Sequence, residues 1–331
     1  MEKTFGALIV NKDENSFQVT VKEIDETYLP KNDTLIKVHY SGINYKDGLA
    51  AQANGKIVKD YPFIPGIDLA GEVVRSDNDK FKPGDKVIAT SYDLGVSHFG
   101  GYSKYASIPS EWILPLPKNM TLKESMILGT AGFTAGLSVQ RLEDNGLRPE
   151  NGKVLVTGAS GGVGGLSVAM LSKKGYTVVA STGKEKEHEY LKGLGASEII
   201  PRDEVYDGTI KSLSKQQWAA AIDPVGGKPL ASLLSKIQYG GSVAVSGLTA
   251  GGSVPTTVYP FILRGVNLLG IDSVYCPMEK RKKVWERIST DLKPSNLEAL
   301  VAKEITLDDL PHTLPAILAG TVRGRILVRM Q

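Results

Sequence analysis

The chain is poor in the residues that bind metal ions and form covalent cross-links. Its 331 residues include one cysteine, Cys276, and four histidines. A single cysteine cannot form an internal disulfide, and zinc sites need thiolate or imidazole ligands at suitable spacing. None of the histidines stands at such a spacing: His39, His98, His188 and His312. We therefore expect no disulfide and no zinc site, and we interpret Cys276 as a packed thiol in a reducing compartment.

Long apolar runs and a large net charge are also absent. No segment reaches the roughly 20 apolar residues that cross a bilayer, and the first residues are too acidic and too weakly apolar for a secretory signal. The net charge of +3 is small and dispersed, which argues against nucleic acid as a partner. We expect a cytoplasmic globular protein of two domains that binds neither membrane nor nucleic acid.

The most informative feature that is present is a glycine-rich turn between a strand and a helix. Residues 154–157 are typical of a buried strand, and residues 163–170 carry apolar side chains at helical spacing. The turn between them is rich in glycine, at Gly158, Gly161, Gly162 and Gly164. Glycine permits a tight turn, and the helix N-terminus that follows presents N–H groups to an anion. The pattern therefore predicts a dinucleotide-binding fold that holds a pyrophosphate.

The next strand ends without an acidic residue, which bears on the choice of coenzyme. NAD-preferring sites place Asp or Glu there, where the carboxylate accepts from the ribose 2′-hydroxyl. Here the strand at 176–181 is followed by Thr182, Gly183 and Lys184. Hydroxyls and an ammonium favour the 2′-phosphate of NADPH over NADH. Ser181 and Thr182 also fit as caps of a helix that begins near Lys184, and the two interpretations are compatible.

The chain divides into a β-rich first third and an alternating remainder. Short β-branched runs between turn residues predict a compact antiparallel barrel over residues 1–125, with strands at 5–10, 18–24, 34–40, 69–75 and 86–90. Over residues 126–294 strands alternate with helices, which predicts a doubly wound parallel sheet of about six strands. Beyond the glycine turn and the strand at 176–181, its strands are expected at 198–200, 218–223, 242–246 and 266–271.

The tail at 295–331 carries a strand, a helix and a second strand. We interpret it as a return to the first domain. The expected fold is therefore α/β, with a split β-rich domain around an inserted dinucleotide-binding domain.

A series of motifs in order resembles the medium-chain dehydrogenase/reductase superfamily over nearly the whole chain. More narrowly, the chain is similar to the zinc-free quinone oxidoreductase branch, and within it to the acrylyl-CoA reductase-like subfamily. Besides the glycine turn, the motifs are at 42–47 (GINYKD), 65–71 (PGIDLAG), 83–85 (PGD), 100–102 (GGY), 129–135 (GTAGFTA), 201–204 (PRDE), 222–227 (IDPVGG) and 260–265 (PFILRG). The resemblance implies a GroES-like first domain, a Rossmann second domain and a homodimer paired through a strand near 266–274.

The resemblance also implies functional residues. It places Tyr45 beside the nicotinamide ribose. Asn44 and Asp47 are interpreted as residues that orient Tyr45 or the acceptor carbonyl, although Asn-x-x-Asp is also an ordinary turn pattern. The resemblance implies a pyrophosphate lining of Ser160, Gly161, Gly162 and Val163. Arg202 is implied at the adenine face or the 2′-phosphate, and the nicotinamide walls are implied at Leu248, Ile262 and Ser273. Local alternatives remain open: Tyr45 packs a wall, Arg202 pairs with Asp203 or Glu204 at the surface, and the wall residues belong to core or loops.

Two further positions have alternative interpretations. Zinc-dependent relatives carry a His-Glu pair where this chain has Ile67 and Asp68. Asp68 either joins a polar network at that place or satisfies backbone N–H groups, and we favour the second. Arg323 and Arg325 are either a solvated pair or ligands of a phosphate.

Without ligands for a metal that would acidify an alcohol, alcohol dehydrogenation is disfavoured. A hydride then needs an acceptor that is already electron-poor, such as a quinone or an alkene conjugated to a carbonyl. The leading prediction is an NADPH-dependent reductase of an activated C=C bond, which the resemblance narrows to acrylyl-CoA reduced to propionyl-CoA. The alternatives are an NADPH:quinone oxidoreductase and a non-catalytic NADPH-binding protein.

Overall fold

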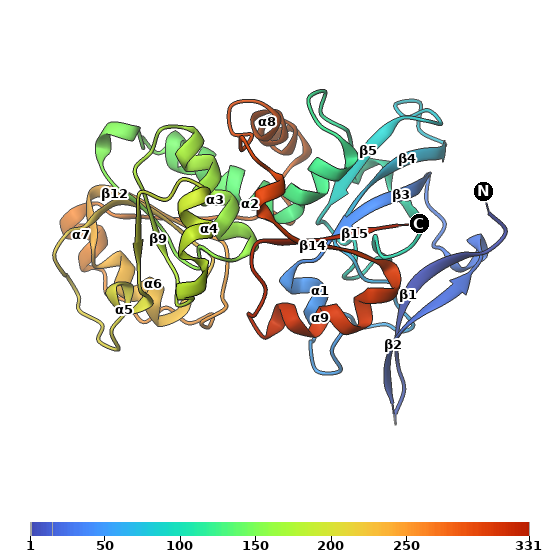
Figure 1. Ribbon diagram of the computed structural model, residues 1–331, viewed down its shortest axis with the longest axis horizontal. Helices are drawn as coiled ribbons and strands as arrows, with labels where there is room; N and C mark the ends of the chain where they lie inside the picture. The colour runs from blue at the N-terminus through green and yellow to red at the C-terminus, as the bar shows by residue number, and fades with distance from the viewer. Residues whose placement is uncertain (1, 15, 331) are drawn as a thin grey trace. The chain divides into compact units, whose positions relative to one another are not determined.

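The structure is a computed structural model that describes residues 2–14 and 16–330. It divides into two compact units (Figure 1). Unit 1 comprises Met1–Thr130, Val274–Lys282 and Val301–Gln331, and unit 2 comprises Ala131–Ser273 and Lys283–Leu300. The expected boundaries, at 125/126 and 294/295, differ from these limits. The largest difference is the segment 274–282, which groups with unit 1.

Hydrogen bonds within unit 1 explain why this segment belongs there. The backbone N–H of Tyr92 donates to the Val274 carbonyl at 3.2 Å. Arg281 is 1% exposed and donates to the carbonyl and the hydroxyl of Thr90, at 3.2 and 3.0 Å. Its guanidinium also lies over the ring of Tyr92, 4.5 Å from the ring centroid. A buried cation needs such partners, so these contacts fix the segment to unit 1.

Unit 1 is built on one large sheet and one hairpin. The hairpin pairs β1 (Phe5–Lys12) with β2 (Phe17–Ile24). The sheet has the order β14 (Val301–Thr306), β15 (Arg325–Arg329), β3 (Thr34–Gly42), β4 (Asp68–Ser76), β5 (Lys86–Thr90) and β7 (Ile113–Pro115), with β6 (Tyr105–Ile108) paired to β3. Because β15 pairs with β3, the end of the chain completes a sheet that its first third begins.

Two short helices of unit 1 pack closely against each other. Helix α1 (Tyr45–Ala50) contacts α9 (Leu310–Leu318). Gly48 lies at the contact, where an added Cβ would meet Ile317 at 2.6 Å. A glycine is therefore needed at this crossing, and the tail thereby fixes the helix that begins at Tyr45.

Unit 2 is a parallel sheet covered by helices on both faces. Its strand order is β10 (Glu198–Ile200), β9 (Val178–Ser181), β8 (Val154–Val156), β11 (Trp218–Asp223), β12 (Ile237–Val245) and β13 (Asn267–Gly270). Figure 1 shows α3 (Gly162–Lys173) and α4 (His188–Gly193) on one face, with α6 (Gly227–Leu234) and α7 (Tyr259–Arg264) on the other. The strand order reverses beside β8, and ligands of such sheets bind at this switch point.

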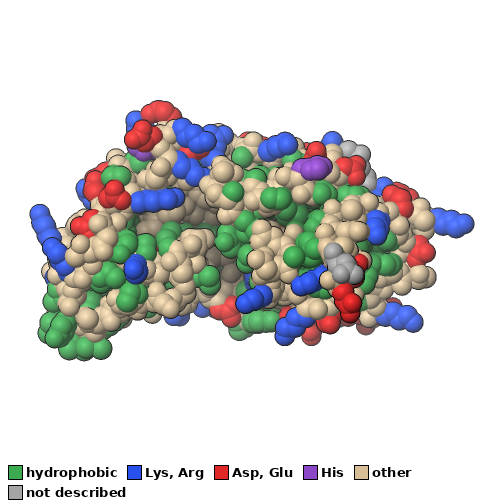
Figure 2. Space-filling model, turned by 90° about the horizontal axis from the view of Figure 1, so that it is seen from below, with side chains coloured by type: hydrophobic (Ala, Val, Ile, Leu, Met, Phe, Trp, Pro, Cys, Tyr) green, Lys and Arg blue, Asp and Glu red, His purple; other side chains and the backbone are tan. Residues whose placement is uncertain are grey.

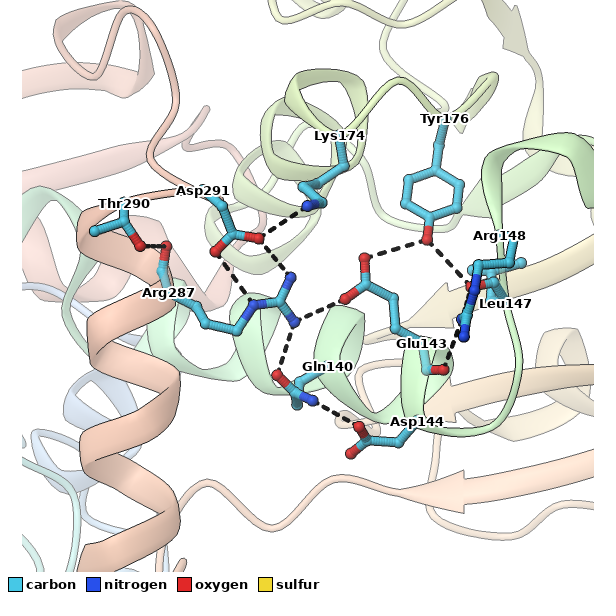
Figure 3. A network of polar contacts seen from close by, with 10 residues as sticks. All are labelled: Gln140, Glu143, Asp144, Leu147, Arg148, Lys174, Tyr176, Arg287, Thr290 and Asp291. Atoms are coloured by element: carbon cyan, nitrogen blue, oxygen red, sulfur yellow. Dashed lines mark hydrogen bonds and ion pairs between the residues drawn. The ribbon is translucent and has the colours of Figure 1, made fainter.

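An ionic network joins three parts of unit 2 (Figure 3). Arg287, in the last turn of α8 (Met278–Ser289), bonds to Glu143 and to Asp291, each at 2.7 Å. Glu143 lies near the end of α2 (Leu122–Asp144) and also accepts from the Tyr176 hydroxyl at 3.2 Å. Lys174 donates to Asp291 at 2.9 Å. Despite partial burial, these carboxylates raise the pKa of Arg287, so the guanidinium stays charged and holds the last turn of α8 on the unit.

The remaining named elements are short. They are the helix α5 (Arg202–Val205) and 3₁₀ turns at Glu26–Tyr28, Ser110–Trp112, Pro149–Asn151, Glu185–Glu187, Glu298–Leu300 and Leu307–Asp309. Over the described part of the chain, no helix is both long enough and apolar enough to cross a bilayer.

Candidate active site

The glycine turn joins β8 to α3 with a geometry that fits a pyrophosphate. Gly158 adopts φ +54°, a left-handed conformation that side chains disfavour. Gly161 is the N-cap of α3, and its N–H donates to the Gly158 carbonyl at 3.0 Å. The N–H groups of the first helical turn have no partner inside the helix and therefore point to the end where an anion binds.

The glycines of the turn serve different purposes. A Cβ at Gly164 would lie 2.3 Å from the Gly158 carbonyl oxygen and 2.7 Å from the Ala159 Cα, so only glycine allows α3 to pack this closely. A Cβ at Gly161 would meet only the Gly158 oxygen, at 3.4 Å. Gly161 is therefore not required by packing within the protein. The lack of a side chain there leaves open space in which a phosphate group can approach the backbone.

Hydroxyl groups line the adjacent ends of β8 and β9. Thr182 and Ser160 are both buried, and their hydroxyl oxygens lie 3.3 Å apart. The Thr182 Oγ1 also accepts from the Lys184 N–H at 3.1 Å. This bond closes a local turn before the helical turn and is not the helix cap that was expected, because Lys184 is itself the N-cap residue and no side chain caps that turn. The nearby helical turn begins at Glu185, as a 3₁₀ turn that leads into α4.

Two cationic side chains meet around Gly183, just beyond β9. An added Cβ on Gly183 would lie 2.9 Å from Nε of Arg202, so the guanidinium packs across this glycine. Burial lowers the pKa of Lys184, and the charge of Arg202 lowers it further, while Glu187 opposes the shift. Two cations near each other, as at Gly183, are an arrangement that favours a bound phosphate.

Arg202 lies at the surface, at the start of α5. Within residues 2–14 and 16–330, no ion pair with Asp203 or Glu204 is found. The structure therefore brings Arg202 to Gly183 and Lys184 rather than to its acidic neighbours.

The three wall residues implied by the resemblance lie at separate places in unit 2. Leu248 follows β12 and is 67% exposed, and Ile262 lies on α7 and is 68% exposed. Ser273 follows β13, and its hydroxyl accepts from Thr134 Oγ1 at 2.9 Å. No hydrogen bond or core cluster of the described residues brings these three together.

In unit 1, Asn44 and Tyr45 begin α1. Asn44 is the N-cap, and its backbone N–H donates to Asp47 Oδ2 at 2.8 Å. The Asn44 amide reaches two charged groups: Nδ2 donates to Asp68 Oδ2 at 2.7 Å, and Oδ1 accepts from Arg325 Nη1 at 3.1 Å. Tyr45, the next residue, is 43% exposed, so its ring is not part of the core.

Asp68 is the centre of a buried polar cluster. It is 0% exposed, and both of its carboxylate oxygens accept from the Thr130 N–H at 3.0 Å. The Thr130 hydroxyl donates to Asp68 Oδ1 at 2.6 Å. These bonds exist because α2 is broken at Gly129 (φ 52°, ψ −153°), which frees the N–H of the next residue. Asp68 thus satisfies a backbone N–H, as favoured from the sequence, and it also joins the network with Asn44.

Arg325 completes this cluster, and both sequence interpretations of it are wrong. The side chain is neither solvated nor placed to bind a phosphate: the residue is 2% exposed and donates to the carbonyls of Ile127 and Ile43 at 3.0 and 2.9 Å. Its Nη2 lies 3.7 Å from Asp68 Oδ2. Arg325 is the first residue of β15, and the first four residues of this strand are buried, so its guanidinium lies in the interior. The carboxylate of Asp68 offsets the buried positive charge.

A second buried carboxylate adjoins the cluster. Asp47 accepts from the backbone N–H groups of Asn44 and Ile67, at 2.8 and 2.9 Å. Burial and the neighbouring charge of Asp68 raise the pKa of Asp47 to about 7, against the effect of these hydrogen bonds and of Tyr102. Two carboxylates therefore share one buried guanidinium, and a proton on Asp47 balances the charge near neutral pH.

Removal of this titrating group should change how stability depends on pH. The raised pKa means that folded Asp47 keeps a proton that the unfolded chain, with an ordinary pKa near 3.8, has lost. Stability should therefore fall as the pH rises between about 4 and 7, by up to ~1.4 kcal/mol per pH unit, and level off above. The free energy of unfolding of Asp47→Asn, measured in urea, should not show this fall between about pH 4 and 7. Three other groups, Asp68, Tyr102 and Arg325, still face the site in the variant. Identical pH profiles for the variant and the wild type would contradict the assignment, and the exposed Asp60→Asn is the control.

Sequence reasoning did not identify Thr130 and Arg325 as members of one cluster with Asn44 and Asp68. A glycine inside a helical pattern, at Gly129, and an arginine within a strand were the available signals. In the described residues, no group of three or more His, Cys, Asp and Glu side chains is arranged to hold a metal ion.

The chain matches two protein families in order. Residues 30–118 match the alcohol dehydrogenase GroES-like domain, and residues 162–290 match the zinc-binding dehydrogenase family. Together these define an oxidoreductase with a GroES-like and a Rossmann domain. The predicted fold class is confirmed.

Individual relatives narrow this class. The chain is 63% identical over 330 residues, all of both chains, to YhfP of Bacillus subtilis, which its name places among the quinone oxidoreductases. It is 48% identical to the acrylyl-CoA reductase AcuI of Ruegeria pomeroyi, over 98% of each chain. The chain belongs to the quinone oxidoreductase and acrylyl-CoA reductase branch of the medium-chain dehydrogenase/reductase superfamily, as its motifs predicted.

Solved structures of relatives agree with this assignment. A crystal structure of B. subtilis YhfP, described as having NAD bound, has a TM-score of 0.97 and covers 99% of this chain and 100% of its own. A structure of the YhdH oxidoreductase from Salmonella enterica, in complex with NADP, has a TM-score of 0.95 at 45% identity. It covers 98% of this chain and 100% of its own. The relatives thus hold either form of the coenzyme.

Proposed function

We propose that this protein is an NADPH-dependent reductase of an activated carbon–carbon double bond, and that acrylyl-CoA, reduced to propionyl-CoA, is its acceptor. The end-to-end similarity to a protein named acrylyl-CoA reductase supports the acceptor. The observation that carries the proposal is the amide of Asn44, held between Asp68 and Arg325 beside the exposed Tyr45. It offers a hydrogen-bond donor to an oxygen on which negative charge develops.

The reaction on the acceptor requires such a donor. NADPH supplies a hydride. On the acceptor, the new C–H bond forms at the β carbon, the π bond breaks, and its electron pair moves onto the thioester oxygen. A proton then adds to the α carbon, which gives propionyl-CoA. We assign Asn44 and Tyr45 as the catalytic residues that bind this oxygen, because one preorganised donor is worth roughly a hundredfold in rate.

The coenzyme is assigned from residues of this chain, since relatives hold both NAD and NADP. The glycine turn fits a pyrophosphate, and the Lys184–Arg202 pair fits the 2′-phosphate of NADPH. The proposed coenzyme contacts are Tyr45, Ser160, Gly161, Gly162, Val163, Thr182, Gly183, Lys184, Arg202, Leu248, Ile262 and Ser273. Leu248 and Ile262 are the exposed apolar members of this set, and a bound nicotinamide would cover them.

Lys184→Ala should weaken NADPH binding without affecting NADH. The variant loses one charge-assisted contact to the 2′-phosphate, which raises the Kd for NADPH by roughly tenfold or more. NADH lacks that phosphate, so its Kd should stay the same. Both constants can be measured by the fluorescence of the reduced nicotinamide, with the exposed Lys186→Ala as the control. An equal loss for both coenzymes would remove the assignment of Lys184.

The choice of acceptor can be tested with the purified protein. Initial rates of NADPH oxidation with acrylyl-CoA should exceed those with benzoquinone at equal concentration. A quinone rate far above the thioester rate would favour the second candidate, an NADPH:quinone oxidoreductase, which the name of the 63% identical relative suggests. Bound NADPH that neither acceptor oxidises would instead indicate a non-catalytic coenzyme-binding protein.

The protein is proposed to be a homodimer that works in the cytoplasm. β13 is an edge strand of the unit 2 sheet, with Leu268 40% exposed, and the adjacent α7 exposes Leu263. Figure 2 shows hydrophobic side chains gathered on the end of unit 2 that carries α7. An unpaired edge beside apolar side chains favours pairing with a second copy. Light scattering should give the mass of two chains, and the mass of one chain would contradict the dimer.

A further inference from the structure

The orientation of the Asn44 amide is fixed by two buried charges of opposite sign. Asp68 accepts from Nδ2 at 2.7 Å, and Arg325 donates to Oδ1 at 3.1 Å. Turning the amide over would place its NH₂ group against the guanidinium and its oxygen against the carboxylate. Both contacts would become repulsive, so only one orientation is stable.

The two charged groups are themselves held without freedom to move. Asp68 is 0% exposed and Arg325 is 2% exposed. Gly42 and Gly129 leave the space that the pair occupies: an added Cβ would lie 2.6 Å from Arg325 Nη2 at Gly42 and 2.4 Å from Asp68 Oδ2 at Gly129. The break of α2 at Gly129 also supplies the N–H of Thr130 that binds Asp68. The chain thus builds a rigid frame around one half-buried amide.

This frame leaves one amide hydrogen of Asn44 for a ligand. Nδ2 carries two hydrogens, and one of them binds Asp68. Within residues 2–14 and 16–330, no hydrogen bond to the second is found. The guanidinium at Oδ1 polarises the amide and makes this remaining N–H a stronger donor.

From this geometry we infer that Asp68 and Arg325 are positioning residues for the reduction: they fix Asn44 so that its second N–H binds the carbonyl oxygen of the acceptor. The inference rests on the proposed function and deepens it. The two residues touch neither acceptor nor coenzyme, and they act only through Asn44. The same contacts that stabilise unit 1 therefore set the direction of a donor group.

An exchange of the two side chains separates positioning from plain stability. In Asp68→Asn, an NH₂ group replaces the carboxylate oxygen that Asn44 binds, so the amide loses its fixed orientation. The kcat with acrylyl-CoA should fall by roughly tenfold or more, with the Kd for NADPH unchanged. In the double variant Asn44→Asp/Asp68→Asn, residue 68 donates to residue 44 and Arg325 keeps its acceptor. The urea midpoint should return toward that of the wild type, but kcat should stay low because the carboxylate then at position 44 has no N–H to offer.

The control is Ser41→Ala, which removes a buried 2.6 Å bond to the Asp68 carbonyl and leaves the carboxylate untouched. It should lower the urea midpoint while kcat stays at the wild-type value. Recovery of kcat in the double variant would overturn the inference, as would a folded Asp68→Asn protein with full kcat. Absence of acrylyl-CoA reduction by the wild type would instead count against the proposed function.

A measurement on the wild-type protein decides the matter even where the variants do not fold. The side-chain amide signals of Asn44 can be followed by nuclear magnetic resonance, with NADP⁺ and the product propionyl-CoA as the probe. One of its two amide protons should shift when propionyl-CoA binds, and the proton bound to Asp68 should stay in place. Two unmoved amide protons at saturating propionyl-CoA would overturn the inference.

Discussion

Alanine at Gly164 should destabilise unit 2 by about 3 kcal/mol, the upper end of the usual cost of overpacking. The added methyl group would lie 2.3 Å from the Gly158 carbonyl oxygen and 2.7 Å from the Ala159 Cα. Both are backbone atoms of the turn and cannot rotate away as a side chain could. Urea unfolding of the protein without coenzyme measures this loss directly.

Gly161→Ala is the matched variant, and it should weaken NADPH binding while it changes stability little. Its methyl group would meet only the Gly158 oxygen at 3.4 Å, an ordinary contact, so stability should fall by less than about 1 kcal/mol. The methyl group would instead occupy the approach of the pyrophosphate. Loss of two charge-assisted hydrogen bonds of about 1.5 kcal/mol each would raise the Kd for NADPH roughly a hundredfold. Normal NADPH binding by a folded Gly161→Ala protein would show that the coenzyme lies elsewhere.

Arg325→Met should destabilise the protein by about 3–5 kcal/mol, because it leaves the Asp68 carboxylate buried without its cation. Asp68 is 0% exposed, and neither water nor salt can replace the lost partner there. The loss should be larger at alkaline than at acidic pH, because above the pKa of Asp47, which burial raises to about 7, a second buried carboxylate is charged and has lost the same cation. Chemical unfolding at several pH values measures both effects.

Arg329→Met is the control for Arg325→Met, because both arginines lie in β15. Arg329 is 3.6 Å from Glu304, and their side chains are 54% and 33% exposed. Water screens such a pair, so its removal should change stability by less than about 1 kcal/mol. Equal effects of the two substitutions would mean that the cluster around Arg325 is not a buried ion pair.

Local sequence patterns were sufficient to predict most of the secondary structure near the site. The strand and helix that flank the glycine turn were expected from apolar spacing, and they are β8 and α3. The expected strand at 86–90 coincides with β5. Strand ends were less accurate where glycine interrupts the pattern. β12 starts at Ile237 rather than 242 because Ile237 also pairs with β11, at Trp218, before a register shift that ends at Ser242. The short strands β6 and β7 were not predicted.

The cluster that holds Asn44 was beyond local reasoning. Its members come from β4, from the break in α2 and from the tail strand β15, and only the folded chain brings them together. Arg325 shows the limit clearly. An arginine beside a glycine predicts a solvated surface residue. Arg325 is buried because the folded chain places Asp68 opposite it, and no local pattern indicates that pairing. The glycines of the coenzyme turn were predictable because their requirement is local.

The path of the hydride can be followed with an isotope. The purified protein is incubated with acrylyl-CoA and NADPH that carries deuterium at the transferable position of the nicotinamide, and the product is analysed by mass spectrometry. Hydride transfer from NADPH to acrylyl-CoA should give propionyl-CoA with one deuterium on its β carbon. Propionyl-CoA without that label, or unreacted acrylyl-CoA beside intact NADPH, would contradict it.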